Sequence, residues 1–281
     1  MKKIFVLCAA STFLFACNQK KAEKTEVETT AKDSVMTDTV KEEKFTKPEQ
    51  TEIYKPVPPV VNPGASSSDA PSDAIVLFDG KNLDQWEAVD QPDQPAEWNV
   101  HDGILTVDKS KGNIQTKEKF GNYQLHIEWK EPKDIDGEGQ GRGNSGLFLA
   151  SIGKGDAGYE MQIMDSYKND TYVNGQAGSI YKQSVPLANP TREPGKWQAY
   201  DVIWTAPQFN EDGSLKSPAY VTAFFNGVLV QNHYELKGPT LYIGKPSYEG
   251  AAHGDSSIKL QAHGDNSKPI SFRNIWVRKL P

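Results

Sequence analysis

The 281-residue sequence predicts an all-β fold, either an antiparallel sandwich or a jelly roll, over most of its length. From Ile75 onward, short apolar runs alternate with polar residues and are separated by Gly, Pro, Asn and Asp, as in half-buried strands joined by turns. No stretch has the spacing of an amphipathic helix of three turns. Roughly a dozen short strands suit one all-β domain, and the lack of an internal repeat argues against a propeller.

Residues 1–17 predict a bacterial lipoprotein signal peptide. Lys2 and Lys3 precede an apolar run, residues 4–16, that is shorter than the ~20 residues of an ordinary membrane span. The run ends in Leu-Phe-Ala-Cys, which is similar to a lipobox, so we expect Cys17 to carry the lipid. The alternative is a plain secretory signal, since Phe15 is bulkier than usual there. A lipidated Cys17 would anchor the protein to a membrane of the cell envelope, facing the periplasm or on the outer membrane.

Residues 18–70 predict a disordered tether between that anchor and a domain at residues 71–281. The stretch is rich in Lys, Glu, Thr, Pro and Ser, and its only aromatic residues are Phe45 and Tyr54. Such a composition buries too little apolar surface to offset the entropy of ordering the chain. The only two cysteines are Cys8 and Cys17, so the predicted domain contains no disulfide.

The predicted domain divides into strands and hairpins. We expect hairpin turns at Asp102-Gly103 and Asn226-Gly227. Type I′ turns need positive φ angles at both central residues, and Asp, Asn and Gly adopt such angles most readily. The expected elements, in chain order, are a strand at 75–78, a hairpin at 98–107, strands at 125–129, 145–150, 159–164 and 197–205, a hairpin at 220–230, and strands at 258–263 and 270–278.

The charge balance and the missing motifs exclude several functions. Lys and Arg number 31 against 37 Asp and Glu, a net charge of −6, which argues against nucleic acid as a partner. The chain has no dinucleotide fingerprint, so we expect no nucleotide cofactor. It also lacks the serine-hydrolase elbow and the His-Glu-x-x-His zinc motif.

Strand alternation collects polar side chains on the faces opposite the core. We expect one concave surface to carry six of them: His126, Glu128, Glu160, Gln162, Gln261 and His263. Carboxylates and imidazoles can act as acid or base, or bind a hard divalent metal ion. The alternative is an ordinary solvated sheet face.

A glycine-rich stretch at residues 139–146 has glycines at every second position, which disfavours a strand. We expect a tight loop that presents Arg142, Asn144 and Ser145 as hydrogen-bond donors, Arg142 toward a carboxylate or a polarised carbonyl oxygen. A plain surface turn is the alternative.

Three further residues have two interpretations each. Asp165 caps a turn or lies at the rim of the site. Tyr181 stacks on a sugar ring or fills a corner of the core. Arg273 lies in the groove or pairs with a buried carboxylate.

Several of these segments, in this order, resemble the 3-keto-disaccharide hydrolase domain family, formerly a domain of unknown function. They are residues 77–86 (LFDGKNLDQW), 143–148 (GNSGLF), 159–166 (YEMQIMDS), 178–181 (GSIY), 226–228 (NGV), 263–264 (HG) and 272–277 (FRNIWV). The resemblance covers residues 75–280 and implies a concanavalin A-like jelly roll. It also implies action on 3-keto-glycosides, sugars that a separate oxidoreductase has oxidised at C3.

The chemistry implied by the resemblance begins with removal of the acidic C2 proton beside the C3 ketone. The enolate expels the C1 substituent, and water then adds to the enone. The resemblance places the site at Arg142, Asn144, Glu160, Gln162, Asp165, His263 and Arg273. Glu160 or His263 would be the base, and Arg142 or a divalent metal ion would hold the enolate oxygen.

Two other functions stay open on the sequence. The same fold could serve a non-catalytic carbohydrate-binding lipoprotein, which aromatic side chains alone in the groove would favour. It could also serve an ordinary glycoside hydrolase, which two carboxylates across the groove would favour. Residues 133–141 and 208–216 look like added loops that reshape the groove.

Overall fold

The structure is a computed structural model that describes residues 44–281. The predicted signal peptide, Cys17 and most of the predicted tether lie outside the described residues. Residues 58–281 form one compact unit. No helix within residues 44–281 is long and apolar enough to cross a membrane.

Short strands make up nearly all of the regular structure in this unit, joined by three short 3-10 helices, with a fourth, η1, lying before it. The elements are η1 (Pro48–Thr51), β1 (Ile75–Phe78), β2 (Trp86–Ala88), β3 (Asn99–His101), β4 (Ile104–Thr106), η2 (Lys109–Lys111), β5 (Ile114–Thr116), β6 (Tyr123–Lys130), η3 (Gly139–Gly141), β7 (Ser145–Ser151), β8 (Gly158–Ile163), η4 (Val173–Gly175), β9 (Gln198–Thr205), β10 (Gln208–Phe209), β11 (Leu215–Ser217), β12 (Tyr220–Phe225), β13 (Val228–Glu235), β14 (Ser257–Leu260) and β15 (Ser271–Lys279).

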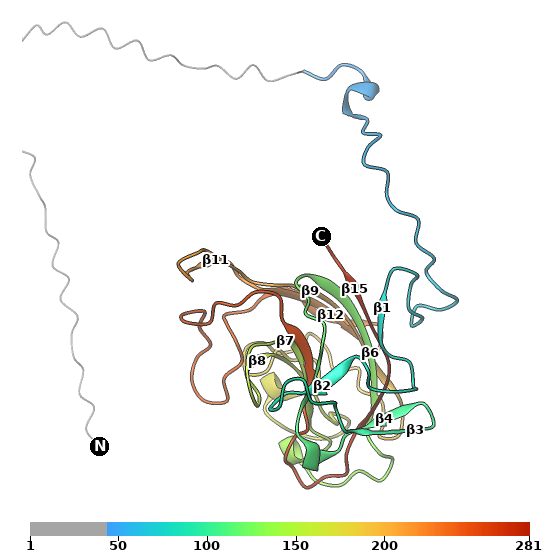
Figure 1. The fold of residues 1–281 in the computed structure, drawn as a ribbon, viewed down its shortest axis with the longest axis vertical. Helices are drawn as coiled ribbons and strands as arrows, with labels where there is room; N and C mark the ends of the chain where they lie inside the picture. The colour runs from blue at the N-terminus through green and yellow to red at the C-terminus, as the bar shows by residue number, and fades with distance from the viewer. Residues whose placement is uncertain (1–43) are drawn as a thin grey trace, which may run out of the picture. The chain divides into compact units, whose positions relative to one another are not determined.

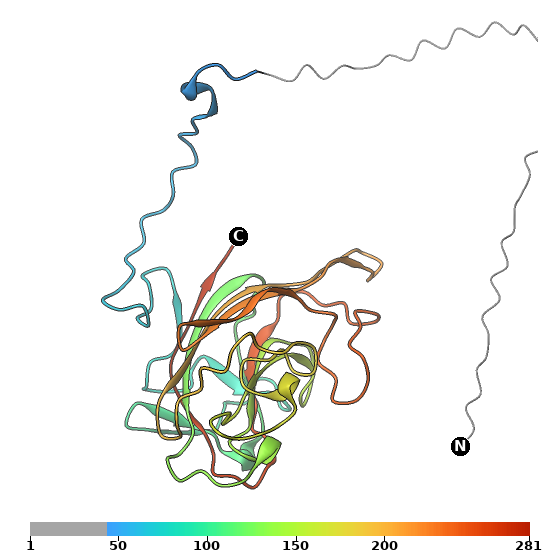
Figure 2. The same cartoon turned by 180° about the vertical axis from the view of Figure 1, so that it is seen from behind.

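Two antiparallel sheets form a concanavalin A-like jelly-roll sandwich, which confirms the predicted fold class. The larger sheet has eight strands in the order β13-β12-β9-β6-β15-β4-β3, with β1 also paired to β15. The smaller sheet has five strands in the order β2-β5-β14-β7-β8. The long strands β6, β9, β12 and β15 run together as one curved layer, and β7 and β8 belong to the other (Figures 1 and 2).

The core lies between the sheets and is rich in aromatic side chains. The ring centres of Trp129 and Tyr200 lie 4.2 Å apart, and those of Trp129 and Phe225 lie 5.2 Å apart. On β6, Leu125, Ile127 and Trp129 are fully buried, as their alternation predicts. On β8, Tyr159, Met161 and Ile163 also belong to the core. The residues between them on β8 therefore face away from it.

Both predicted hairpins are confirmed, and so are their turn residues. Asp102 and Gly103 have φ angles of 50° and 77°, between β3 and β4. Asn226 and Gly227 have φ angles of 51° and 81°, between β12 and β13. Positive φ at both positions matches the twist that short hairpins need.

The structure differs from the predicted elements in three places. β14 ends at Leu260, so His263 lies in the following loop rather than on the strand. β2 and β5, three residues each, were too short to predict. Residues 208–216 hold most of a small hairpin, β10 with β11, in place of an irregular loop.

Ordered contacts begin before residue 70, where we ended the predicted tether. The carbonyl oxygen of Ser68 accepts hydrogen bonds from Trp276 Nε1 at 2.9 Å and from Asn274 Nδ2 at 2.8 Å, both on β15. These bonds use a backbone carbonyl, which composition does not reveal.

Candidate active site

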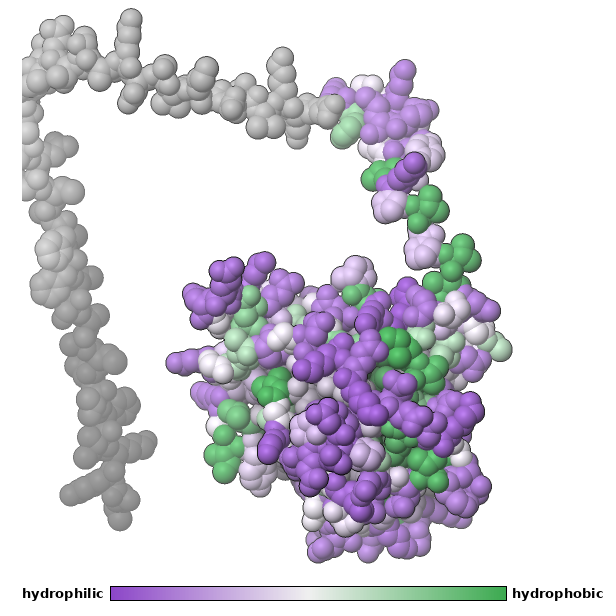
Figure 3. Space-filling view, in the orientation of Figure 1, coloured by the Kyte–Doolittle hydropathy of each residue, from purple (hydrophilic) through white to green (hydrophobic). Residues whose placement is uncertain are grey.

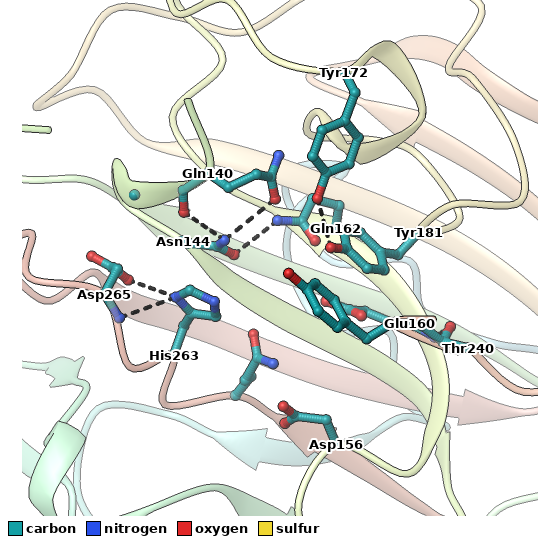
Figure 4. A pocket seen from close by; sticks show the side chains of 13 residues that line it. Gln140, Asn144, Asp156, Glu160, Gln162, Tyr172, Tyr181, Thr240, His263 and Asp265 are labelled. Carbon is teal, nitrogen blue, oxygen red and sulfur yellow. Dashed lines mark hydrogen bonds and ion pairs between the residues drawn. The ribbon is translucent and has the colours of Figure 1, made fainter. Parts of the chain in front are cut away.

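A cavity of about 470 Å³ lies on the outer face of the five-stranded sheet, at the β7–β8 edge. Figure 4 shows the side chains that surround it. This volume suits a small ligand such as a sugar. The lining residues are Gln140, Gly141, Asn144, Asp156, Glu160, Gln162, Tyr172, Tyr181, Thr240, Tyr242, Gln261, His263 and Asp265.

Glu160 projects from β8 into this cavity and is only 6% exposed. Burial raises the pKa of its carboxyl to about 8, and the charge of nearby Asp156 adds to the rise, while Lys259 opposes it. The neighbouring strand β7 leaves room for this side chain at Gly146, where a Cβ would lie 2.7 Å from Glu160 Oε1. The carboxyl is therefore largely protonated at neutral pH.

A chain of amide groups forms one wall of the cavity. Gln162 Nε2 donates to Asn144 Oδ1 at 2.8 Å, and Asn144 Nδ2 donates to the carbonyl oxygen of Gln140 at 2.8 Å (Figure 4). These bonds join β8 to the glycine-rich loop at η3. Asn144 and Gln162 are thus held in fixed positions.

Two buried amide oxygens at the cavity are left unsatisfied. Gln162 Oε1 and Gln261 Oε1 have no hydrogen-bond partner among the described residues. An unpaired buried acceptor costs about 1–3 kcal/mol, so these oxygens suit a ligand that brings its own donors. Sugar hydroxyl groups are such donors.

His263 and Asp265 form a pair on the loop after β14. His263 Nδ1 lies 2.9 Å from Asp265 Oδ2. Burial opposes ionisation of Asp265, but hydrogen bonds from His263, Ser267 and Lys109 outweigh it and lower the pKa of this carboxyl to about 2. The backbone N–H of Asp265 also points at His263 Nδ1, at 3.2 Å. The bond to the ionised carboxylate is shorter and charge-assisted, so Asp265 favours the imidazole tautomer with its proton on Nδ1. The opposite edge of the ring faces the cavity (Figure 4).

Tyr172 and Tyr181 form another wall of the cavity. The hydroxyl oxygens of Tyr172 and Tyr181 lie 2.6 Å apart (Figure 4). Only one proton can lie between two hydroxyl oxygens, so the second proton is free to be donated to a ligand. Burial raises the pKa of Tyr181, which keeps that hydroxyl protonated.

The β7–β8 turn brings Asp156 to the cavity, and buried polar groups hold this turn. Asn113 Nδ2 donates to Asp156 Oδ1 at 2.9 Å. The Lys259 ammonium, on fully buried β14, donates to the carbonyl oxygens of Gly153, Gly155 and Ala157 at 3.2, 2.8 and 2.8 Å. The turn is thereby fixed against the sheet.

Six of the residues predicted for the site or its surface line the cavity together, namely Asn144, Glu160, Gln162, Tyr181, Gln261 and His263. Ser145 does not line it: its hydroxyl is buried and donates to the carbonyl oxygen of Gln261 at 2.7 Å. Alternation places Ser145 on the core side of β7, next to cavity-facing Gly146.

Arg142 and Asp165 also do not line the cavity. Arg142 Nε lies 2.7 Å from Asp165 Oδ2, and Arg142 lines a different cavity, together with Lys133 and Lys168. Asp165 is 1% exposed, and burial raises the pKa of its carboxyl despite Arg142. The expectation that Arg142 lies beside Glu160 and His263 is therefore wrong, because the loop turns this side chain toward a buried carboxylate.

Arg273, His126 and Glu128 belong to the other sheet. Arg273 on β15 pairs with Glu128 on β6 at 2.6 Å, and His126 Nδ1 lies 2.7 Å from Asp201 Oδ1. The expectation that His126 and Glu128 share one surface with Glu160 is wrong. Alternation tells which residues share a face of one strand, but it does not tell to which sheet that strand belongs. Of the two interpretations of Arg273, the structure has the second, since its partner Glu128 is a buried carboxylate.

Sequence reasoning missed six lining residues that lie in loops without a strand pattern: Gln140, Asp156, Tyr172, Thr240, Tyr242 and Asp265. Two signals were available. Asp265 follows His263 by two residues, and Gln140 lies within the glycine-rich stretch that we singled out.

The described residues offer no ready set of ligands for the predicted divalent metal ion. Among residues 44–281, no three His, Cys, Asp or Glu side chains are grouped closely enough to hold one. We therefore derive no chemical step through a metal ion.

Comparison with known proteins matches residues 73–278 to the family described as the 3-keto-alpha-glucoside-1,2-lyase-like domain. The chain belongs to this family. The family that we expected from the sequence motifs is therefore confirmed. A curated relative of this lyase-like domain, the 3-keto-disaccharide hydrolase of Bacteroides thetaiotaomicron, is 24% identical over 73% of this chain and 78% of its own length.

Two solved structures share the fold of this chain. A Parabacteroides distasonis protein, crystallised under the provisional name of glycosyl hydrolase, is 55% identical, with a TM-score of 0.77. The match covers 83% of this chain and 97% of that one. Another protein of that organism is 22% identical with a TM-score of 0.52 over 74% of this chain and 99% of its own, which supports the fold alone.

Proposed function

We propose that this chain cleaves 3-keto-glycosides by elimination and hydration. The observation that carries the proposal is the pairing, in one sugar-sized cavity, of a carboxyl that is protonated at neutral pH with an imidazole oriented by an ionised carboxylate. Family membership and the name of the Bacteroides relative support the choice of substrate.

The chemistry needs one base and one acid. A base takes the C2 proton, and the C2–H electrons form an enolate with the C3 carbonyl. The enolate re-forms the ketone while the C1–O bond breaks, and the leaving oxygen takes a proton from the acid. Water then adds to C1 and a proton returns to C2, so that one water molecule is consumed for each glycoside cleaved.

We assign the base to His263 and the acid to Glu160. With its proton on Nδ1, His263 offers Nε2 to the cavity as an acceptor for the C2 proton. Glu160, with a pKa of about 8, holds a proton that it can give to the leaving oxygen at neutral pH.

The remaining lining residues would bind the sugar. The unpaired oxygens of Gln162 and Gln261 would accept hydrogen bonds from hydroxyl groups. The free proton of the Tyr172–Tyr181 pair and the amide of Asn144 are donors for the oxygen that becomes the enolate. Arg142, which pairs with Asp165, has no part in this proposal.

One observation favours an ordinary glycoside hydrolase as the second candidate. Asp156 and Glu160 are two carboxyl groups that line the same cavity, as the acid and the nucleophile or base of such an enzyme would. An ordinary glycosidase needs no ketone at C3, so the two candidates differ in their substrates. The clustered ionisable groups disfavour the purely carbohydrate-binding alternative.

The test compares residues 58–281 on a 3-keto-glucoside and on the matching unoxidised glucoside. We expect cleavage of the first only, because the C2 proton is acidic only beside a ketone. Cleavage of the unoxidised glucoside at a comparable rate would favour the ordinary glycosidase. A parallel pair of reactions with and without chelator tests the predicted divalent ion.

We also propose that the protein works at the cell envelope, held by the lipid on Cys17. Its substrate would then be supplied by a separate enzyme that oxidises the C3 hydroxyl of glycosides.

A further inference from the structure

Three consecutive apolar residues are exposed next to the cavity. Leu241, Tyr242 and Ile243 are 43%, 74% and 84% exposed. Tyr172 and Val173, on the segment across from them, are exposed as well, and both Tyr172 and Tyr242 line the cavity. We call these five residues the apolar rim. The face of the compact unit seen in Figure 3 is mostly hydrophilic, with separate apolar spots. Exposed apolar side chains on two segments at the mouth of one cavity indicate a binding surface.

The loop that carries Leu241, Tyr242 and Ile243 is hydrogen-bonded to β8. The backbone N–H of Thr240 donates to the carbonyl oxygen of Gly158 at 2.8 Å. Thr240 Oγ1 accepts a hydrogen bond from the backbone N–H of Glu160 at 2.9 Å. The loop is thus tied to β8 at the proposed acid itself, and the exposed side chains keep a fixed position relative to it.

Lys182 joins the two halves of the rim. Its ammonium donates to the carbonyl oxygen of Tyr242 at 2.7 Å. It also lies 4.2 Å from the ring centre of Tyr242, 5.5 Å from that of Tyr181 and 5.7 Å from that of Tyr172. Cation–π attraction holds these rings around one charge. The rim is therefore a built feature of the cavity mouth.

We propose that the apolar rim is the binding site for an apolar aglycone, the group attached to C1 of the sugar. This inference rests on the proposed function. A cavity of about 470 Å³ accommodates the sugar, and a larger C1 substituent extends to the mouth, where Tyr172 and Tyr242 stand.

The chemistry of the rim favours an apolar aglycone over a second sugar. The side chains of Val173, Leu241 and Ile243 neither donate nor accept hydrogen bonds. The hydroxyl groups of a second sugar would lose water against them without gaining partners. An apolar aglycone gains from the same burial, and flat faces stack on the tyrosine rings.

The test compares methyl and cyclohexylmethyl 3-keto-glucosides of the same anomeric configuration. The two departing alcohols have similar pKa values, so a difference in kcat/KM reports binding of the apolar group. We expect kcat/KM to be about tenfold higher for the cyclohexylmethyl substrate, mainly through a lower KM. In Leu241→Ser and Ile243→Ser the preference should fall to about twofold.

Phe224→Ser is the matched control, because Phe224 is a similarly exposed apolar side chain on β12 of the other sheet. It should keep the tenfold preference. Equal kcat/KM values for the two substrates would overturn the inference while leaving the proposed function intact. So would a preference that both rim variants retain, or a stronger preference for 3-keto-maltose. Failure to turn over either glucoside would overturn the proposed function, and this inference with it.

Discussion

Glu160 and Asp265 show how burial and hydrogen bonding set two carboxyl groups of one cavity apart. Both are poorly exposed, but Asp265 receives hydrogen bonds from Lys109, His263 and Ser267, which stabilise its charge. Glu160 sits beside another carboxyl, that of Asp156, and burial raises its pKa to about 8. Asp265 therefore stays ionised and orients a base, while Glu160 keeps a proton to donate.

The assignment of Glu160 as the acid predicts a dependence on the leaving group. Glu160→Gln should lower kcat/KM for an alkyl 3-keto-glucoside by about 10²–10³. For a 4-nitrophenyl 3-keto-glucoside the loss should be below about tenfold, because nitrophenolate leaves without a proton. The wild-type rate on the alkyl substrate should also fall as pH rises through about 8. Equal losses on both substrates would instead make Glu160 the base.

The raised pKa of Glu160 also predicts a pH-dependent cost in stability. The folded state binds this proton up to about pH 8, whereas the unfolded chain releases it near the ordinary value of 4.5. Wild-type stability relative to Glu160→Gln should therefore fall as pH rises from about 4.5 to 8. We expect the variant to be more stable by roughly 2–4 kcal/mol at pH 8 and similar to wild type at pH 4, by urea unfolding. A constant difference across this range would contradict the buried, neutral carboxyl.

At the scale of elements, β7 makes room for the side chains of β8. Gly146 lies opposite Gln162 in the β7–β8 ladder, and a Cβ there would lie 2.7 Å from Glu160 Oε1 and 3.3 Å from Gln261 Oε1. The glycine thus clears the floor of the cavity, where a larger residue would displace the acid.

Gly146→Ala should therefore lower kcat by about tenfold or more with a cooperative thermal transition retained, because the extra methyl group pushes Glu160 out of place. Steady-state kinetics and a thermal melt measure both. The matched control is Gly254→Ala, since no atom lies within 4 Å of a Cβ built there. Wild-type kinetics in Gly146→Ala would show that the position of Glu160 is not critical.

The sequence predicted the strands well and the site in part. Glu160 and Gln162 alternate with core residues on one strand, so their shared face follows from the pattern. The position of Arg142 could not be predicted, because its partner, buried Asp165, comes from a segment more than twenty residues later. Asp156 and Tyr242 reach the cavity from loops, whose path depends on tertiary contacts such as those of Asn113 and Lys182.

For the molecule as a whole, the lipid on Cys17 is the predicted link to the membrane. Cys17→Ser should move the protein from the membrane fraction to the soluble fraction of cells, because we expect no other segment to hold it there. Immunoblots of the two fractions measure this. Continued membrane association of the variant would contradict the lipoprotein prediction.

The predicted anchor also determines where the protein would meet its substrate. An envelope enzyme for 3-keto-glycosides takes its substrate from a C3-oxidising partner and releases the aglycone and a 3-keto sugar. In this scheme the protein itself carries out no redox step, since the ketone that acidifies C2 is already present.

The fate of the hydrogen at C2 tests the central claim most directly. A 3-keto-glucoside deuterated at C2 is cleaved partway in ordinary water, and the deuterium at C2 of the product is measured by mass spectrometry, with an enzyme-free control for spontaneous exchange. We predict that the enzyme-made sugar loses the label, because the base removes it before the C1 bond breaks. The C2 deuterium isotope effect on the cleavage rate is needed as well, because a base that returns the same deuteron to C2 would also retain the label. Full retention of deuterium together with no such isotope effect would contradict elimination and favour ordinary glycoside hydrolysis.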